Sequence, residues 1–282
     1  MVRGIYTGAS GMISSMDEMN TVANNLANVN TDGYKKETSV LKAFPEMLMR
    51  RINDNGVVKF PLGSYDLAPI AGKIGTGVEF NESFIRYDQG SLTETGNEMD
   101  FALESEGFLT VMTENGERYT RAGSFTISND GYLVDKKGSK VMGENGFIRV
   151  GQNNFQVDKE GNIYVNSDYE PTDFVEKAGN EWKGMTKLDR MKIVDFPEKR
   201  YLEKEGYTNY RESDFSGPAV ILEGNNRPNV KQGFLEKSNV DPVMEMTRMI
   251  EIQRLYEANQ KVIQTSDEVL GKAINQVGRG LA

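Results

Sequence analysis

The stretch DPVMEMTRMIEIQRLYEANQKVIQTSDEVLGKAINQV, residues 241–277, carries the strongest helical pattern in the chain. Asp241 suits an N-cap, and Pro242 suits the first helical position, where a missing N–H costs nothing. Apolar and small side chains then recur at alternating spacings of three and four residues: Met249, Ile252, Tyr256, Asn259, Ile263, Ser266, Leu270, Ala273 and Val277. This heptad spacing predicts a helix of about 35 residues that packs along a second helix.

The other end of the chain carries a matching pattern. Its seam repeats with the same alternation at Ile5, Ala9, Met12, Met16, Met19, Ala23 and Leu26. Gly4, Gly8 and Gly11 interrupt this segment, each at a cost of about 1 kcal/mol relative to alanine, and they leave room for close backbone approach. We therefore expect the two terminal helices to pair, and the N-terminal one to be marginal alone.

The segment NNLANVNTDGYKK, Asn24–Lys36, places asparagines where the first helix ends. An amide against a helix seam can fix the register of a coiled coil, so Asn25, Asn28 and Asn259 are candidates for that role. The turn at residues 31–33 then redirects the chain. An ordinary helix C-terminus followed by a loop fits the same spacing.

The middle of the chain changes character. Short apolar alternations (FLTVM, SFTIS, YLV, NIYV) alternate with ENG, NDG, KKG and KEG turns, which predicts an antiparallel β-domain with tight hairpins. Residues 191–196 and 219–222 are further strand candidates, whereas residues 37–75 show little periodicity and contain three prolines. We predict an α+β fold: N-terminal helix 1–36, extended arm 37–75, β-rich outer domain 76–240 and C-terminal helix 241–282.

Composition excludes several classes of protein. The chain has no cysteine and no histidine, so thiolate metal sites and Cys or His catalysis are absent. A net charge of −9 argues against nucleic-acid binding, and clusters such as Lys35-Lys36 are interpreted as solvated surface. We see neither an apolar run long enough to cross a membrane nor a cleavable signal peptide.

Three weak patterns suggest chemistry. GKIGTGVEF, residues 72–80, lacks the ending of a phosphate-binding loop, and a calcium-like loop at residues 158–162 lacks its bidentate acid. Many carboxylates lie close in sequence, but nothing selects a catalytic pair. We therefore expect no enzyme activity, no cofactor and no metal.

Five blocks resemble the flagellar basal-body rod proteins: GIYTGASGM (4–12), ANNLANVNTDGYKK (23–36), GSLTETGNEMDFALESEGFLTV (90–111), YTRAGSFTISNDGYLV (119–134) and GFLEKSNVDPVMEMTRMIEIQRLYEANQKVI (233–263). They cover roughly half the chain. The run at residues 133–150 and the LEKSNVDPV entry to the last helix are most like the proximal rod type (FlgF type). The IGTGV element at residues 74–78 is similar to distal rod proteins, and that alternative stays open.

The resemblance implies a structural subunit that transmits torque, with its terminal helices in a helical inner tube and its β-domain outside. It implies export through the flagellum's own type III secretion channel and a place in the periplasmic part of the rod. The implied partners are copies of the chain, other rod proteins, hook-basal-body ring components and the export apparatus. The expected assembly contacts are Met12, Met16, Met19, Asn25, Leu26, Asn28, Met249, Ile252, Tyr256, Asn259, Ile263 and Leu270.

Two alternatives come from other classes. A monomeric β-rich surface or carbohydrate binding module, closed by its own helical hairpin, would also use paired heptads. A carboxylate-dependent glycoside hydrolase is the weaker alternative.

Overall fold

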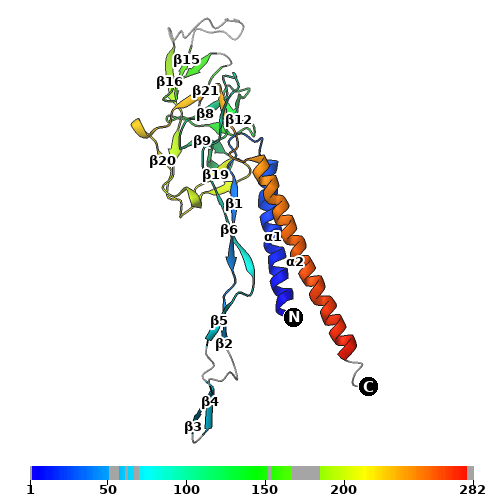
Figure 1. Cartoon of the computed structure of the whole chain (residues 1–282). Coiled ribbons are helices and arrows are strands. Elements are labelled where there is room, and N and C mark those ends of the chain that lie inside the picture. Colours follow the sequence, from blue (N-terminus) through cyan, green and yellow to red (C-terminus); the bar gives the residue numbers. More distant parts are fainter. Residues whose placement is uncertain are drawn as a thin grey trace. The chain divides into compact units, whose positions relative to one another are not determined.

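The computed structural model describes residues 2–50, 57–60, 63–66, 70–151, 154–166 and 185–277. The chain is α+β, as predicted, with a helix at each end and strands between them (Figure 1). It divides into two compact units. We call Met1–Asn24, Glu37–Phe84 and Val243–Ala282 the helical unit, and Asn25–Lys36 with Ile85–Pro242 the β-unit. The domain boundaries predicted at residues 36, 75 and 240 remain a prediction.

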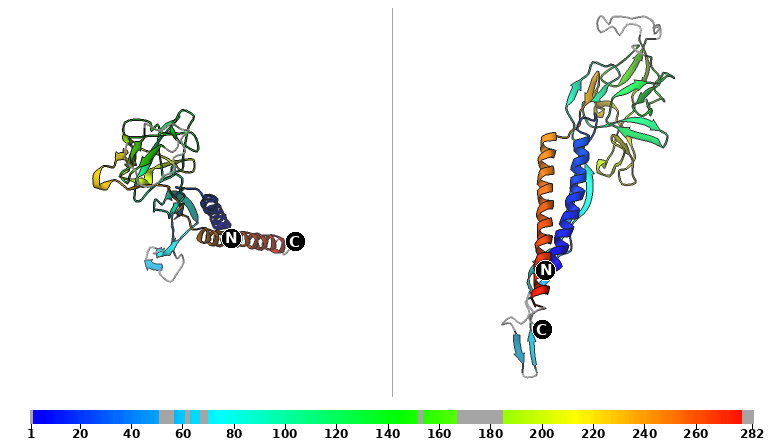
Figure 2. Two further views of the ribbon diagram at one scale, coloured as in Figure 1. Left: turned by 90° about the horizontal axis from the view of Figure 1, so that it is seen from above. Right: turned by 90° about the vertical axis from the view of Figure 1, so that its right-hand side faces the viewer.

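The helical unit contains α1 (Val2–Ala27) and α2 (Pro242–Val277), apart from the last turn of α1. The predicted start of α2 at Pro242 is confirmed. The helices lie side by side in both views (Figures 1 and 2) and run antiparallel, because residues 4, 8, 11 and 18 of α1 approach residues 266, 263, 259 and 248 of α2.

The arm is a series of antiparallel strand pairs, which the weak periodicity of residues 37–75 did not predict. The pairs are β1 with β6, β2 with β5 and β3 with β4. Their bounds are β1 (Glu37–Ala43), β2 (Met47–Arg50), β3 (Val57–Phe60), β4 (Gly63–Asp66), β5 (Ile70–Ile74) and β6 (Val78–Ile85). The first part of β6 packs on α1, where the Ser14 hydroxyl donates a hydrogen bond of 3.1 Å to the Val78 carbonyl.

The β-unit is built on a nine-stranded antiparallel sheet within the described residues. Its strand order is β11-β12-β13-β9-β10-β19-β18, and β17 joins β9 to β20. These strands are β9 (Phe108–Thr113), β10 (Gly116–Thr120), β11 (Phe125–Ile127), β12 (Leu133–Asp135), β13 (Lys140–Val141), β17 (Ile193–Asp195), β18 (Glu203–Glu205), β19 (Asn209–Arg211) and β20 (Val220–Ile221).

Smaller sheets and two 3-10 turns complete the β-unit. A three-stranded sheet joins β14 (Phe155–Val157), β15 (Asn162–Val165) and β16 (Thr186–Arg190). Strand β8 (Phe101–Leu103) pairs with β21 (Val230–Gln232), and β7 (Leu92–Glu94) pairs with β22 (Phe234–Glu236). The 3-10 turns span Lys199–Tyr201 and Gly224–Asn226.

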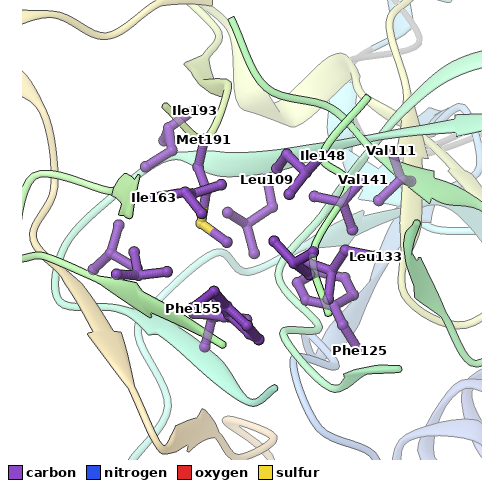
Figure 3. Close-up of a cluster of buried hydrophobic side chains, with 14 of the residues drawn as sticks. Leu109, Val111, Phe125, Leu133, Val141, Ile148, Phe155, Ile163, Met191 and Ile193 are labelled. Atoms are coloured by element: carbon purple, nitrogen blue, oxygen red, sulfur yellow. The ribbon is translucent and has the colours of Figure 1, made fainter. Parts of the chain in front are cut away.

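Two hydrophobic clusters hold the β-unit together, and β9 contributes to both. Leu109 and Val111 point into a large cluster with Phe125, Phe155 and Met191 (Figure 3). Phe108, on the opposite face of the strand, packs in a second cluster of aromatic rings. Burying a side chain of this size contributes about 1.5–3 kcal/mol. Because both faces of β9 are covered, it is a central strand.

The predicted hairpins are confirmed. The ENG, NDG, KKG and KEG turns lie between β9 and β10, β11 and β12, β12 and β13, and β14 and β15. The glycines of these four turns all have positive φ, between 78° and 105°. The strand candidates at residues 191–196 and 219–222 contain β17 and β20. Residues 167–184 lie outside the described residues, and they include the start of the less regular portion predicted at residues 171–235.

Candidate functional site

One face of α2 is less exposed than the rest of the helix. Ile252 is 4 % exposed, and Met249, Tyr256, Ile263 and Leu270 are half-buried, as are Asn259, Ser266 and Ala273. The residues directly flanking Tyr256 and Ile263 are exposed. The residues of the predicted heptad therefore share the less exposed face of α2, which we call its inner face, whereas their coiled-coil pairing stays a prediction; the side chain of Val277 lies outside the described residues.

The face of α1 that meets α2 is a stripe of glycines. A Cβ added to Gly8 would lie 3.0 Å from Ile263 Cγ1, and one added to Gly11 would lie 2.7 Å from Asn259 Nδ2. The close approach expected from these glycines is thus present. The predicted seam of α1 does not form one buried face, because Met16 is 53 % exposed while Met12 and Met19 are half-buried.

Both helices carry a second apolar face that remains exposed. On α1 it comprises Tyr6, Ile13 and Met16, each more than half exposed. On α2 it comprises Leu255, Val262 and Val269, at spacings of seven residues and 52 %, 48 % and 44 % exposed. We call these the outer α1 face and the outer α2 face. A heptad repeat that is not covered within the chain is suited to another helix.

A third face of α2 is polar. It carries exposed amides and carboxylates at helical spacing: Gln253, Glu257, Gln260, Gln264 and Asp267. The two apolar faces and this polar face make α2 a three-sided helix.

The asparagines at the end of α1 are buried within their own chain. The Asn25 Oδ1 atom accepts a hydrogen bond of 3.1 Å from the Tyr34 hydroxyl, and both residues are almost fully buried. Asn28 Oδ1 accepts one from the Thr31 hydroxyl. These bonds give Asn25 and Asn28 an intramolecular role, and their contact with neighbouring subunits remains a prediction.

A buried carboxylate joins distant parts of the β-unit. Glu236 Oε1 accepts hydrogen bonds from Lys35 Nζ at 2.6 Å and from the Gly90 N–H at 2.9 Å. Its Oε2 accepts from Arg121 Nη1 at 3.3 Å, and Lys35 Nζ also donates to the Asp88 carbonyl at 2.8 Å. The side chains of Lys35 and Glu236 are only 1 % exposed. We call Lys35, Arg121 and Glu236 the hinge cluster.

The charges of the hinge cluster depend on one another. Burial lowers the pKa of Lys35 below its ordinary value, while the charge of Glu236 acts in the opposite direction. Burial lowers the pKa of Arg121 as well, again opposed by Glu236. Without the carboxylate, two cations would be buried unpaired. The interpretation of Lys35 as a solvated surface residue is therefore wrong.

Gly33 brings the turn after α1 onto the hinge cluster. Its φ is 69°, and its N–H donates a hydrogen bond of 2.7 Å to the Glu236 carbonyl. A Cβ at this position would overlap the backbone of Arg121 and Ala122. Only glycine combines this conformation with this closeness, so the turn predicted at residues 31–33 is also a packing contact.

Sequence reasoning missed the hinge cluster and, apart from Met16, the outer faces of both helices. Lys35, Arg121 and Glu236 are far apart in the chain, and no local spacing connects them. The outer α1 face had a visible signal, since residues 6, 9, 13 and 16 alternate at spacings of three and four. Within the described residues, neither helix has an apolar stretch long enough to cross a membrane.

Three family descriptions match successive parts of the chain. Residues 5–35 match "Flagella basal body rod protein", residues 102–165 match "Flagellar hook protein FlgE/F/G D1 domain", and residues 231–276 match "Flagellar basal body rod FlgEFG protein C-terminal". The first and last cover most of the two helices, and the second covers β9 to β15.

Curated relatives match over nearly the whole chain. The flagellar basal-body rod protein FlgG of Bacillus subtilis is 32 % identical, over 98 % of this chain and 99 % of the relative. FlgG of Borreliella burgdorferi is 34 % identical over 98 % of each chain, and FlgF of Caulobacter vibrioides is 30 % identical over 99 % of each.

Proposed function

Because the chain belongs to the flagellar basal-body rod protein family, we propose that it joins copies of itself and other rod proteins through the outer faces of α1 and α2. As a member of this family it is a structural subunit of the rod in the flagellar basal body, and it is not an enzyme.

The observation that carries the proposal is the presence of two apolar faces on each helix. A hairpin of two helices needs one seam on each, and here that role falls to the glycine stripe of α1 and the inner face of α2. The outer faces leave large side chains such as Ile13, Met16 and Val262 in water. Covering such side chains contributes about 1.5–3 kcal/mol each when burial is complete. Helices with two such faces suit a layer in which each has neighbours on both sides.

The twelve predicted assembly residues divide by position. Met16 belongs to the outer α1 face, whereas Met249, Ile252, Tyr256, Asn259, Ile263 and Leu270 form the inner face of α2. We propose that this inner face holds α1 against α2 in a coiled-coil-like pair. The pair then presents both outer faces to its neighbours.

The test places a charge on an outer face. Met16→Asp and Val262→Asp should each prevent incorporation into basal bodies, because an unpaired carboxylate would be buried between helices. Gln264→Asp puts the same charge on the polar face of α2 and should incorporate normally. The readout is the amount of each variant in basal bodies isolated from a flagellated host that lacks its own copy. Normal incorporation of both outer-face variants would contradict the proposal.

We propose the FlgF type and the proximal position for this chain. The support is the sequence of residues 133–150 and of the entry to α2, while relatives named FlgF and FlgG match at similar identity. Expression in hosts that lack either FlgF or FlgG tests the choice. Restored motility in the host without FlgF is expected, and restoration only in the host without FlgG would reverse the assignment.

Membership of the rod family also supports proposals about export, location and further partners. We propose export through the flagellar type III channel, a position in the periplasmic part of the rod and contact with hook-basal-body ring components. A fusion of the chain to a tightly folded domain should block export and appear in the cell fraction, whereas export of the intact fusion would argue against passage as an unfolded chain.

A further inference from the structure

An open groove of about 590 Å³ lies in the β-unit among three hairpin turns. The β12–β13 turn contributes Lys137 and Lys140, the β18–β19 turn contributes Glu205, and the β9–β10 turn contributes Glu114 and Asn115. Phe147, which is 44 % exposed, also lines it. Because the Glu205 carboxylate is paired with Arg118 at 2.5 Å, the groove offers two lysines and an aromatic ring beside one exposed glutamate.

The chain segment that supplies Lys137 and Lys140 is basic, although the protein is acidic. Residues 131–150 carry four basic side chains and two acidic ones, while the whole chain has a net charge of −9. Neither Lys137 nor Lys140 forms an ion pair with any described residue. The nearby Asp135 accepts hydrogen bonds from the backbone N–H groups of Lys137 and Ser139, so it is engaged in the turn.

Two aromatic rings of this region already form cation–π contacts with Lys140. Lys140 Nζ lies 4.5 Å from the ring centroid of Tyr132 and 5.3 Å from that of Phe147. This arrangement fixes the ammonium group beside the exposed Phe147 ring. A partner that brings both a carboxylate and an aromatic ring would match it.

The same unit carries such a segment, the loop of residues 212–217. Phe215 is 77 % exposed, with its ring centroid 6.0 Å from that of the half-exposed Tyr201. Glu212 and Asp214 beside it are exposed as well. The loop is anchored, since the Ser213 hydroxyl donates a 2.6 Å hydrogen bond to the Tyr201 carbonyl. Phe215 is thus presented on a defined support.

We propose that the 212–217 loop of one copy docks into the Lys137–Lys140 groove of the next copy. The carboxylates of Glu212 and Asp214 meet the two ammonium groups, and the Phe215 ring packs beside Phe147. This inference rests on the proposed assembly of copies side by side. It adds a specific contact between β-units to the contacts between helices.

The loop and the groove are made of different segments of the β-unit. The loop lies between β19 and β20, whereas the groove is lined by the β9–β10, β12–β13 and β18–β19 turns. A contact between two different surfaces of identical copies repeats from copy to copy, and it forms an open helical array when the rotation does not close a ring. That is the symmetry required of a rod.

The absence of cysteine in the chain gives a direct test. Pro218→Cys and Asn115→Cys are made in separate full-length chains, because Pro218 is exposed directly after the loop and Asn115 is an exposed residue of the groove, and neither is a proposed contact. After the two variants assemble together, a short thiol-specific cross-linker should join them. Thr126→Cys, an exposed position on β11 outside the groove, is the matched control and should remain unlinked to Pro218→Cys.

The two proposals fail in different ways. If the cysteine variants assemble but no loop-to-groove cross-link forms, the docking contact is wrong and the helical assembly stands. If the unmodified chain does not assemble at all, the proposed function fails first. Cross-linking of the control pair to the same extent would also overturn the specific contact.

Charge reversal supplies a second readout. Lys137→Glu with Lys140→Glu should lower incorporation at least tenfold relative to Lys159→Glu with Lys187→Glu, which changes the net charge equally at exposed positions outside the groove. Glu212→Lys with Asp214→Lys in the partner copies should restore incorporation. Equal behaviour of the two lysine double variants, or no restoration, would overturn the proposal.

Discussion

Glu236 shows how much of the β-unit depends on one side chain. Its carboxylate contacts Lys35, Gly90 and Arg121, which come from three separate segments. Because the side chains of Lys35, Arg121 and Glu236 are buried, water does not replace a lost ion pair. Glu236 therefore holds together three separate segments of the β-unit, including the one that ends at Lys36.

Replacing Glu236 by Gln should destabilise the β-unit by about 3 kcal/mol or more, because Lys35 and Arg121 would then be buried without a countercharge. Denaturant unfolding of the full chain, followed by near-UV circular dichroism, measures this change. Glu203→Gln is the control: it breaks an ion pair with Arg211 in which both side chains are more than half exposed, and should cost far less stability. Equal losses of stability in the two variants would mean that the hinge cluster contributes no more than a surface ion pair.

Gly33 and Gly96 provide a comparison in which only the surroundings differ. Both have a φ of 69°, so Ala carries a similar backbone strain of about 1–3 kcal/mol at either position. At Gly96 nothing lies within 4 Å of an added Cβ, whereas at Gly33 the Cβ overlaps a neighbouring backbone. Gly33→Ala should therefore destabilise the chain more than Gly96→Ala in the same unfolding measurement. A difference near zero would show that the turn can move away.

The sequence predicted local turns better than it predicted the environment of individual side chains. The turn at residues 31–33 follows from local preferences, whereas the predicted role of Asn25 and Asn28 in assembly stays a prediction. The burial of Lys35 does not, since it depends on Glu236, 201 positions away. A charged side chain next to a turn is usually exposed to solvent. Lys35 departs from that expectation because Glu236, its partner in the folded structure, is buried beside it.

The helices illustrate how elements divide their surfaces. Each uses one face within the chain and exposes another that is equally apolar, and α2 adds a polar face. The heptad on α2 was predicted from spacing alone, because a regular repeat over many turns is a strong signal. On α1 the predicted seam lies between the glycine stripe and the outer face. A search for apolar repeats selects large side chains, whereas the residues of α1 that contact α2 are glycines.

Gly11→Leu should weaken the pairing of α1 with α2, because the new side chain would occupy the space of Asn259. Gly271→Leu on α2 is the control, since nothing lies within 4 Å of its Cβ and the helix gains propensity of up to about 1 kcal/mol. Protection of α1 amides from hydrogen exchange measures the effect. Faster exchange is expected only for Gly11→Leu, and an unchanged pattern would mean that the glycines are not required for the contact.

At the scale of the whole molecule, the β-unit is discontinuous in sequence. It combines Asn25–Lys36 with Ile85–Pro242, and the arm and both helices belong to the other unit. The sequence predicted a β-rich centre between helical ends. It did not predict that the first strand-free segment after α1 packs with the centre, because no periodicity marks that segment.

Limited proteolysis of the soluble full-length chain should therefore remove the terminal helices but retain residues 25–36. Tyr34 and Lys35 are buried in the β-unit, so cleavage on their N-terminal side is expected near Asn25 and not near residue 37. Intact-mass analysis of the surviving fragments locates the ends. If the helices resist as strongly as the centre, the pairing of α1 with α2 is already stable in the single copy, and only their outer faces await a neighbour.

The position of Glu236 also has a consequence for the order of folding. Lys35 emerges early and its partner about 200 residues later, so the hinge cluster closes only when nearly the whole chain is present. In the proposed export of an unfolded chain, Lys35 cannot pair with Glu236 until both residues have left the channel. The β-unit of an exported subunit would therefore be completed only at the end of its passage.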